Sequence, residues 1–76
     1  MSDLPRVTGP ETVSAFEKLG FVVARISGSH HVMKKQGHRY NLSVPVHGNK
    51  IVKRGTLRSL ISDAGITVED FQKALD

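Results

Sequence analysis

The sequence predicts an α+β fold in which a three-stranded antiparallel sheet carries its helices on one face. Helical apolar periodicity near both ends of the chain, with β-branched or alternating runs between them, predicts this class. Each expected helix and strand has one apolar side, and packing the helices on one sheet face buries all of these sides together. We expect residues 1–76 to form a single domain, with residues 1–7 flexible.

The first helix is expected over about Pro10 to Leu19. Thr8 is a suitable N-cap residue, and Glu11 follows three residues later, as in a capping box. Proline is tolerated in the first helical turn, because the backbone N–H that it lacks would have no partner within the helix there. Gly20 is placed to end the helix, and the apolar side chains before it recur at helical spacing: Val13, Phe16 and Leu19.

Three strands are expected next. The first is the run Phe21 to Ser27, followed by a turn at Gly28 and Ser29; the second runs from His30 to Lys35 and stops near Gly37. Pro45 cannot donate a ladder hydrogen bond, so the third strand is expected to fray or to lie at an edge there. That strand alternates polar residues with apolar ones, at Tyr40, Leu42, Val44 and Val46.

A second amphipathic helix is expected to end at Gly65, and its apolar positions are Leu57, Leu60, Ile61 and Ala64. Thr67, with Asp70 three residues later, opens a short last helix that contributes Phe71 and Leu75. The resulting order, α-β-β-β-α plus a terminal α, makes the fold double-stranded-RNA-binding-domain-like. Element order alone assigns no function.

Charged residues are distributed unevenly along the chain. The formal net charge is +4, and no Asp or Glu occurs between Glu17 and Asp63, a window that holds nine Lys and Arg and all four His. A solvated basic surface is the simple explanation, but an acid-free middle between acid-bearing ends favours a polyanionic partner. We expect a cytoplasmic protein without membrane contact, because no apolar run approaches the roughly 20 residues of a membrane span.

Several chemistries are disfavoured. Two-metal nucleases need several carboxylates near the phosphate, and the basic window offers none. The chain has no cysteine and no Gly-rich phosphate loop, and neighbours such as Ser29 and His30 point to opposite sides of an extended chain. A histidine-only zinc site would match no standard spacing. We therefore expect no metal and no other cofactor.

Imidazole and basic side chains together suit RNA cleavage. RNA supplies its own nucleophile, the 2′-hydroxyl, so a histidine can take its proton while cations stabilise the charge on the phosphoryl oxygens. His30 and His31 would face opposite sides of their strand, and the sequence leaves open which faces the core. His47 lies on the polar face of the third strand, at its end, and His38 lies in the loop between the second and third strands. For each of these taken alone, a surface histidine without a role remains the alternative.

The residues expected to hold RNA phosphates are Arg25, Lys34, Lys35, Arg39, Lys50, Lys53, Arg54 and Arg58. The last four cluster around the start of the second helix, where they serve either solubility or a phosphate clamp aided by the helix N-terminus. Gly28 has two compatible interpretations. It permits a positive φ in the turn, and its missing side chain lets a phosphate approach the backbone.

Three motifs together resemble the HicA (YcfA-like) toxins of toxin–antitoxin systems. They are Leu19-Gly20-Phe21, Gly28-Ser29-His30, and Pro45-Val46-His47 leading into Gly55-Thr56-Leu57. The resemblance runs from about Thr8 to Leu75. Ile51 and Val52 depart from it, because a more acidic and polar pair is expected there.

The resemblance implies the toxin of a type II toxin–antitoxin system, a metal-independent endoribonuclease that cuts mRNA and arrests translation. It implies a HicB antitoxin as the protein partner. The family's catalytic histidine corresponds to His30, with Gly28 and Ser29 shaping the turn, and His47 is an accessory candidate. Two rival functions remain from the residues alone: a non-catalytic RNA-binding module and a protein–protein adaptor.

Overall fold

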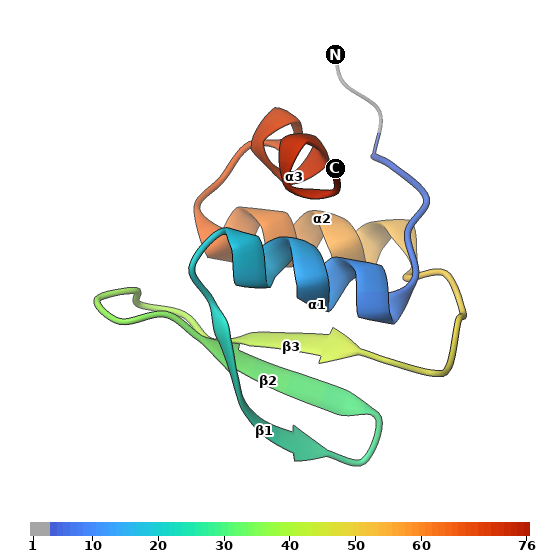
Figure 1. Cartoon of the computed structure of the whole chain (residues 1–76), viewed down its shortest axis with the longest axis horizontal. Helices are drawn as coiled ribbons and strands as arrows, with labels where there is room; N and C mark the ends of the chain where they lie inside the picture. The colour runs from blue at the N-terminus through green and yellow to red at the C-terminus, as the bar shows by residue number, and fades with distance from the viewer. Residues whose placement is uncertain (1–3) are drawn as a thin grey trace.

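The sheet of this protein is covered by helices on one face only (Figure 1). The computed structural model describes residues 4–76, and the strands lie in the order β1-β2-β3, each antiparallel to the next. Helices α1 and α2 pack on the sheet, and α3 lies on their far side. The elements are α1 (Gly9–Lys18), β1 (Val22–Ser27), β2 (His30–Lys34), β3 (Leu42–Pro45), α2 (Arg54–Ala64) and α3 (Val68–Ala74). The predicted fold class is confirmed.

The helix boundaries follow from local hydrogen bonding. The Thr8 hydroxyl accepts from the Glu11 N–H at 3.2 Å, and the Glu11 carboxylate accepts from the Thr8 N–H at 2.8 Å. This confirms the predicted capping box, and Thr67 with Asp70 forms another at α3. Gly65 ends α2 in the left-handed conformation, with φ of 72°. None of the helices within residues 4–76 is long and apolar enough to cross a membrane.

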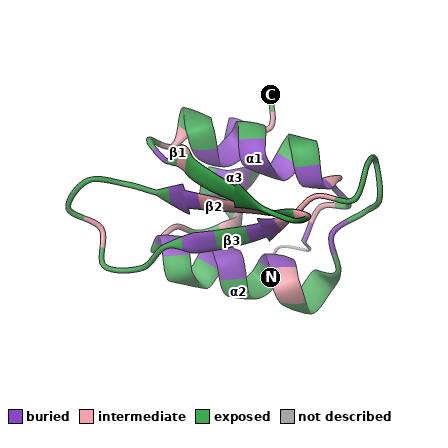
Figure 2. Ribbon diagram, turned by 90° about the horizontal axis from the view of Figure 1, so that it is seen from below, coloured by how far each residue is buried: buried purple, intermediate pink, exposed green. Residues whose placement is uncertain are grey.

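The strand register decides which histidine faces the helices. Met33 and Val44 are both fully buried, so the side chains of β2 that share a face with Met33 point toward the helices. His31 is one of these, and it is half-buried. His30 consequently lies on the opposite, open face of the sheet, which Figure 2 shows free of helices. The register also shifts in β1 between Val23 and Arg25, which leaves Ala24 unpaired.

One expectation is corrected by the packing. Tyr40 was expected on the apolar face of the third strand, but β3 begins only at Leu42 and the Tyr40 side chain is 53% exposed.

Residues 1–7 were expected to be flexible, and residues 1–3 of this segment lie outside the described part of the chain. Leu4 and Val7 are buried, and the Val7 carbonyl accepts from the Val52 N–H at 2.8 Å. The segment from residue 4 onward is therefore packed into the core.

One close backbone approach holds α1 against the end of β3. A Cβ atom on Gly9 would lie 2.6 Å from the Pro45 carbonyl oxygen and 2.8 Å from the Val46 Cα. Only a residue without a side chain fits between these backbones. The contact fixes the place at which the chain leaves β3 and begins the connection to α2.

His38 anchors the loop between β2 and β3. Its Nε2 lies 2.6 Å from the Asp63 carbonyl oxygen near the end of α2, and its ring meets the Phe21 ring edge-on, with 5.3 Å between centroids. The Phe21 ring is in turn in edge contact with that of Phe16. The loop is thereby tied to both the helical layer and the core.

We expect His38→Ala to lower the free energy of unfolding by about 1–2 kcal/mol, from the lost hydrogen bond and ring contact. The Asp63 carbonyl can accept a hydrogen bond from water instead, which limits the loss of stability. Urea unfolding followed by circular dichroism measures it, with Gln36→Ala, an exposed residue of the same loop, as the control. An unchanged midpoint for His38→Ala would show that the loop is held by other contacts.

Candidate active site

A tight hairpin turn presents His30. Ser27 and His30 are the last paired residues of β1 and β2, so Gly28 and Ser29 form a two-residue loop. Gly28 has a φ of 59°, a value that such hairpins often require at their first central position and that glycine adopts without strain. The prediction of a positive φ at this turn is confirmed. The His30 side chain is exposed immediately after the turn.

The turn is attached to the chain segment that follows β3. The Val46 N–H donates to the Ser29 carbonyl at 2.6 Å, which extends the β2–β3 pairing by one residue. The Ser29 hydroxyl also lies 3.4 Å from His47 Nε2, at the long end of hydrogen-bonding distance. Two histidines distant in the sequence, His30 and His47, are thus held beside the same turn.

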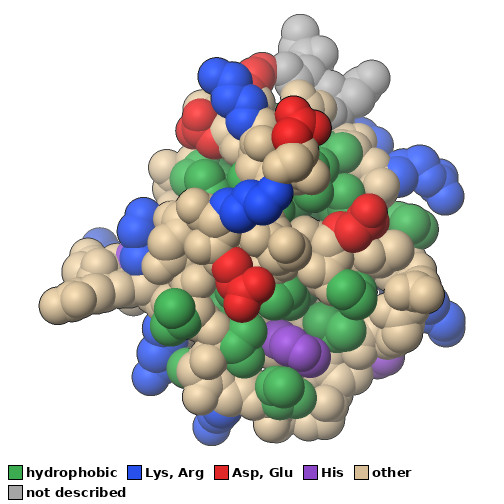
Figure 3. All heavy atoms as spheres, in the orientation of Figure 1, with side chains coloured by type: hydrophobic (Ala, Val, Ile, Leu, Met, Phe, Trp, Pro, Cys, Tyr) green, Lys and Arg blue, Asp and Glu red, His purple; other side chains and the backbone are tan. Residues whose placement is uncertain are grey.

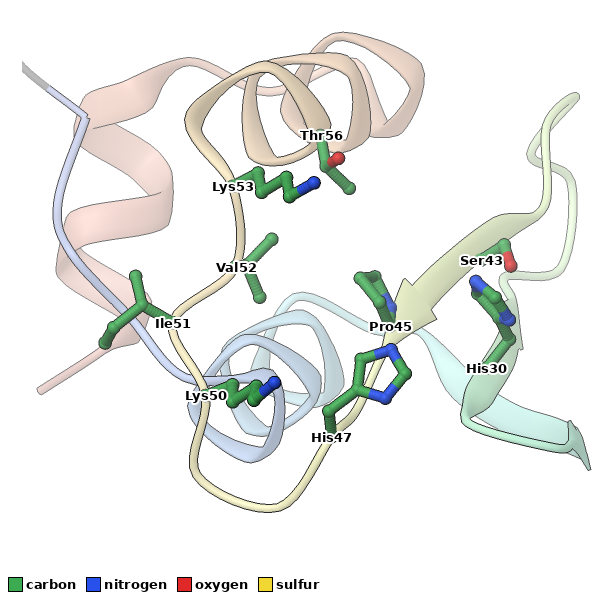
Figure 4. Close-up of a pocket in the computed structure, with 9 residues that line it drawn as sticks. All are labelled: His30, Ser43, Pro45, His47, Lys50, Ile51, Val52, Lys53 and Thr56. Atoms are coloured by element: carbon green, nitrogen blue, oxygen red, sulfur yellow. The ribbon is translucent and has the colours of Figure 1, made fainter.

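A pocket of about 490 Å³ opens at this place, between β3, the start of α2 and the connection between them (Figure 4). Lys50 and Lys53 extend from that connection toward the side on which Pro45 and His47 lie. Lys53 is also the N-cap residue of α2, and its side chain makes no capping hydrogen bond. The lining consists of His30, Ser43, Pro45, His47, Lys50, Ile51, Val52, Lys53 and Thr56.

The structure brings only some of the predicted phosphate-binding residues to the pocket. Lys50 and Lys53 line the pocket, whereas Arg54 and Arg58 are exposed on α2 and do not line it. Arg25 is exposed on the open sheet face, since it pairs with Val32, which shares that face with His30. Three more residues lie toward the end of the sheet away from the hairpin turn: Lys34 at the last position of β2, and Lys35 and Arg39 beyond it. Lys35 is engaged elsewhere, with its ammonium 5.6 Å from the centre of the Phe21 ring.

Carboxylates are kept away from the pocket. Within residues 4–76, all acidic side chains lie on the helices except Asp76 at the end of the chain. On the side of the molecule that Figure 3 shows, the red carboxylates accordingly lie over the helices, and none lies over the sheet. In the same described part of the chain, no three His, Cys, Asp or Glu side chains are grouped to hold a metal ion.

Two polar residues of the pocket were missed by the sequence reasoning, Ser43 and Thr56. Ser43 alternates with the buried Leu42 and Val44, so the strand pattern placed it on the polar face of the third strand, which the register shows to be the face of His30. Thr56 follows Gly55 in the first turn of α2, where a polar side chain faces the connection. Both contribute hydroxyl groups, which donate or accept hydrogen bonds. The lining therefore offers imidazole, ammonium and hydroxyl groups, and no carboxylate.

Val52 and Ile51 explain how the connection is held. Val52 is 6% exposed and Ile51 44% exposed, and Ile51 pairs with Thr8 in an isolated antiparallel bridge. The apolar pair that departs from the expected family pattern thus anchors the connection against the segment before α1. Lys50 and Lys53 are carried on either side of this anchor.

Comparison with known families gives one match that covers most of the chain. The model described as HicA toxin of bacterial toxin–antitoxin matches residues 9–66, which include the hairpin turn, β3, the connection and α2. A comparison with curated proteins found no match. The match includes both histidines and both lysines of the pocket, and this chain belongs to the HicA toxin family.

Proposed function

We propose that this toxin is a metal-independent endoribonuclease that cuts mRNA and thereby arrests translation, with His30 as its general base. One observation carries the proposal: His30 is exposed beside a pocket whose other ionisable side chains are a second histidine and two lysines. This set of groups binds a phosphate and moves protons.

The pocket supplies a base and positive charge for this reaction. The His30 imidazole takes the proton of the 2′-hydroxyl, whose oxygen attacks the adjacent phosphorus. The bond from phosphorus to the 5′-oxygen breaks, and the departing oxygen takes up a proton. The ammonium groups of Lys50 and Lys53 stabilise the charge on the non-bridging phosphoryl oxygens. DNA lacks the 2′-hydroxyl, so the same site is expected to leave DNA intact.

Contacts to other phosphates would run from the pocket in two directions. Arg54 and Arg58 extend it along α2, where no acidic residue occupies the first turn and the N–H groups at the N-terminus favour anions. Arg25 extends it over the open sheet face. Lys34, Lys35 and Arg39 would contact only a longer RNA that continues along the sheet away from the turn.

We expect Lys53→Ala to weaken binding to single-stranded RNA and to reduce the slope of log affinity against log salt by about 0.7, the value for one lost phosphate contact. Fluorescence anisotropy at several salt concentrations measures this slope. Lys73→Ala on α3 is the control, because this exposed lysine lies outside the pocket. A slope that is unchanged in Lys53→Ala would remove Lys53 from the interface.

Substrate selectivity tests the proposed function. The full chain is incubated with an RNA, the DNA of the same sequence, and the RNA with 2′-O-methyl groups throughout. We expect cleavage of the RNA alone. Binding of the RNA without cleavage would instead support the rival function, a non-catalytic RNA-binding module, because the same cations serve both. Absence of binding even at low salt would support a protein–protein adaptor.

The antitoxin is proposed to act on the same pocket. A HicB antitoxin that covers the Gly28–His30 turn with acidic or apolar side chains would neutralise the basic surface and block access to His30. Adding increasing amounts of the cognate antitoxin is expected to abolish RNA cleavage at a fixed stoichiometry. Cleavage that persists in the presence of excess bound antitoxin would place its contact elsewhere on the toxin.

A further inference from the structure

His47 is held in place by the turn that presents His30. Its Nε2 lies 3.4 Å from the Ser29 hydroxyl, while the Val46 N–H before it is bonded to the Ser29 carbonyl at 2.6 Å. The backbone before His47 is thereby fixed, and the Ser29 hydroxyl lies within reach of the ring of this exposed residue.

The pocket brings His47 and His30 together. His30 pairs directly with Pro45, the last residue of β3, and His30, Pro45 and His47 all line the pocket. Gly28, which the extended pairing would bring opposite His47, has no side chain to fill the space between. Both imidazoles therefore border the space in which a phosphate would bind.

We propose that His47 is a second catalytic residue, the general acid of the reaction, and that Ser29 is the residue that positions it. This inference rests on the proposed ribonuclease function. His30 accepts the 2′-hydroxyl proton, the 2′-oxygen bonds to phosphorus, and the bond from phosphorus to the 5′-oxygen breaks. The departing electron pair stays on the 5′-oxygen, which receives a proton from the His47 imidazolium. The products are a 2′,3′-cyclic phosphate and a 5′-hydroxyl, and proton exchange with water restores both histidines.

The two ring nitrogens of His47 have different partners in this step. Nε2 faces Ser29, so in the imidazolium Nε2–H donates to the hydroxyl and Nδ1–H remains for the leaving oxygen. The ionisable groups that face His47 across the pocket are His30 from β2 and Lys50 and Lys53 from the connection to α2, with no carboxylate among them. The rate is expected to rise and then fall with pH, as it does when one group must accept a proton and another must donate one.

A modified leaving group isolates this proton transfer. The substrate is an RNA in which sulfur replaces the 5′-bridging oxygen, at a linkage that the unmodified protein is first shown to cut. A thiolate leaves without being protonated. On the oxygen linkage, we expect His47→Ala to lose a factor of about 10² or more in rate. On the sulfur linkage it is expected to recover to within about tenfold of the parent and to lose the falling limb of the pH profile.

His30→Ala is expected to stay slow on both linkages, because the 2′-hydroxyl must still be deprotonated. His47→Gln, which keeps a hydrogen-bonding side chain next to Ser29, is expected to behave as His47→Ala does. Equal losses on oxygen and sulfur in both His47 variants would overturn the acid role while leaving the ribonuclease function intact. A parent protein that cuts neither linkage would overturn the ribonuclease function, and this inference with it.

The positioning role of Ser29 is tested separately. Ser29→Ala is expected to lower kcat with little change in KM and to weaken the falling limb of the pH profile, while Ser29→Thr, which keeps the hydroxyl, restores both. Ser59→Ala, at an exposed position of α2, is the control. Identical losses in the Ala and Thr variants of Ser29 would show that the turn needs serine for its shape and not for its contact with His47.

Discussion

His30→Ala is expected to cut RNA about 10² to 10⁴ times more slowly than the parent protein, with the fold unchanged. His30 is exposed at the first position of β2, and the hydrogen bonds described around the turn involve Ser29 and not the His30 ring. Its removal therefore deletes a proton acceptor and no packing. RNA affinity should persist, because the lysines of the pocket remain. Cleavage rates at saturating RNA measure the effect.

His31 provides a matched control one residue away. It lies on the helical side of the same strand, half-buried, and its buried Nδ1 has no hydrogen-bond partner. His31→Gln is expected to keep the cleavage rate of the folded protein. If His31→Gln lost as much activity as His30→Ala, the effect would be structural. If His30→Ala cut RNA at the parent rate, His30 would not be the general base.

Gly9→Ala is expected to be strongly destabilising. The new Cβ would lie within 2.8 Å of two backbone atoms, the Pro45 oxygen and the Val46 Cα, and neither can move without shifting β3 or α1. Overpacking of this kind costs about 1–3 kcal/mol. For a domain of this size, each kcal/mol lowers the melting temperature by about 4–8 °C. Because Val46 precedes His47, the variant should also cut RNA more slowly at temperatures at which it remains folded.

The matched control is Gly55→Ala, also in the first turn of a helix. Nothing lies within 4 Å of a Cβ built on Gly55, and its backbone φ is not positive. Its melting temperature is expected to stay the same or to rise slightly, since alanine restricts the unfolded chain more than glycine does. A Gly9→Ala protein as stable as Gly55→Ala would mean that α1 and β3 separate easily, and that the close approach does not fix the site.

Local sequence signals predicted most of the fold. The Thr8–Glu11 and Thr67–Asp70 capping boxes, the glycine at the end of α2 and the alternation around Leu42 act within a few residues, so they can be recognised without a structure. Tyr40 was misplaced because alternation continues in the sequence beyond the point where pairing begins. Nothing in the sequence marks the strand's first paired residue.

The site depends on contacts between distant segments, which the sequence patterns do not contain. Which of His30 and His31 faces the core depends on the burial of Met33 and on the pairing of β2 with β3, and neither follows from periodicity. The sequence around Gly9 gives no sign that this position excludes a side chain; the restriction comes from Pro45, far along the chain. The gathering of Lys50 and Lys53 at His30 likewise requires the connection to fold back beside β3.

The most direct test of the central claim is to identify the RNA ends that the full chain produces in EDTA. A long single-stranded RNA is incubated with the parent protein and with His30→Ala, and the new ends of the fragments are analysed by mass spectrometry. Attack by the 2′-hydroxyl without a metal ion predicts fragments with 2′,3′-cyclic phosphate and 5′-hydroxyl ends from the parent alone. RNA that stays intact in EDTA, or fragments with 5′-phosphate ends, would contradict a histidine-based ribonuclease.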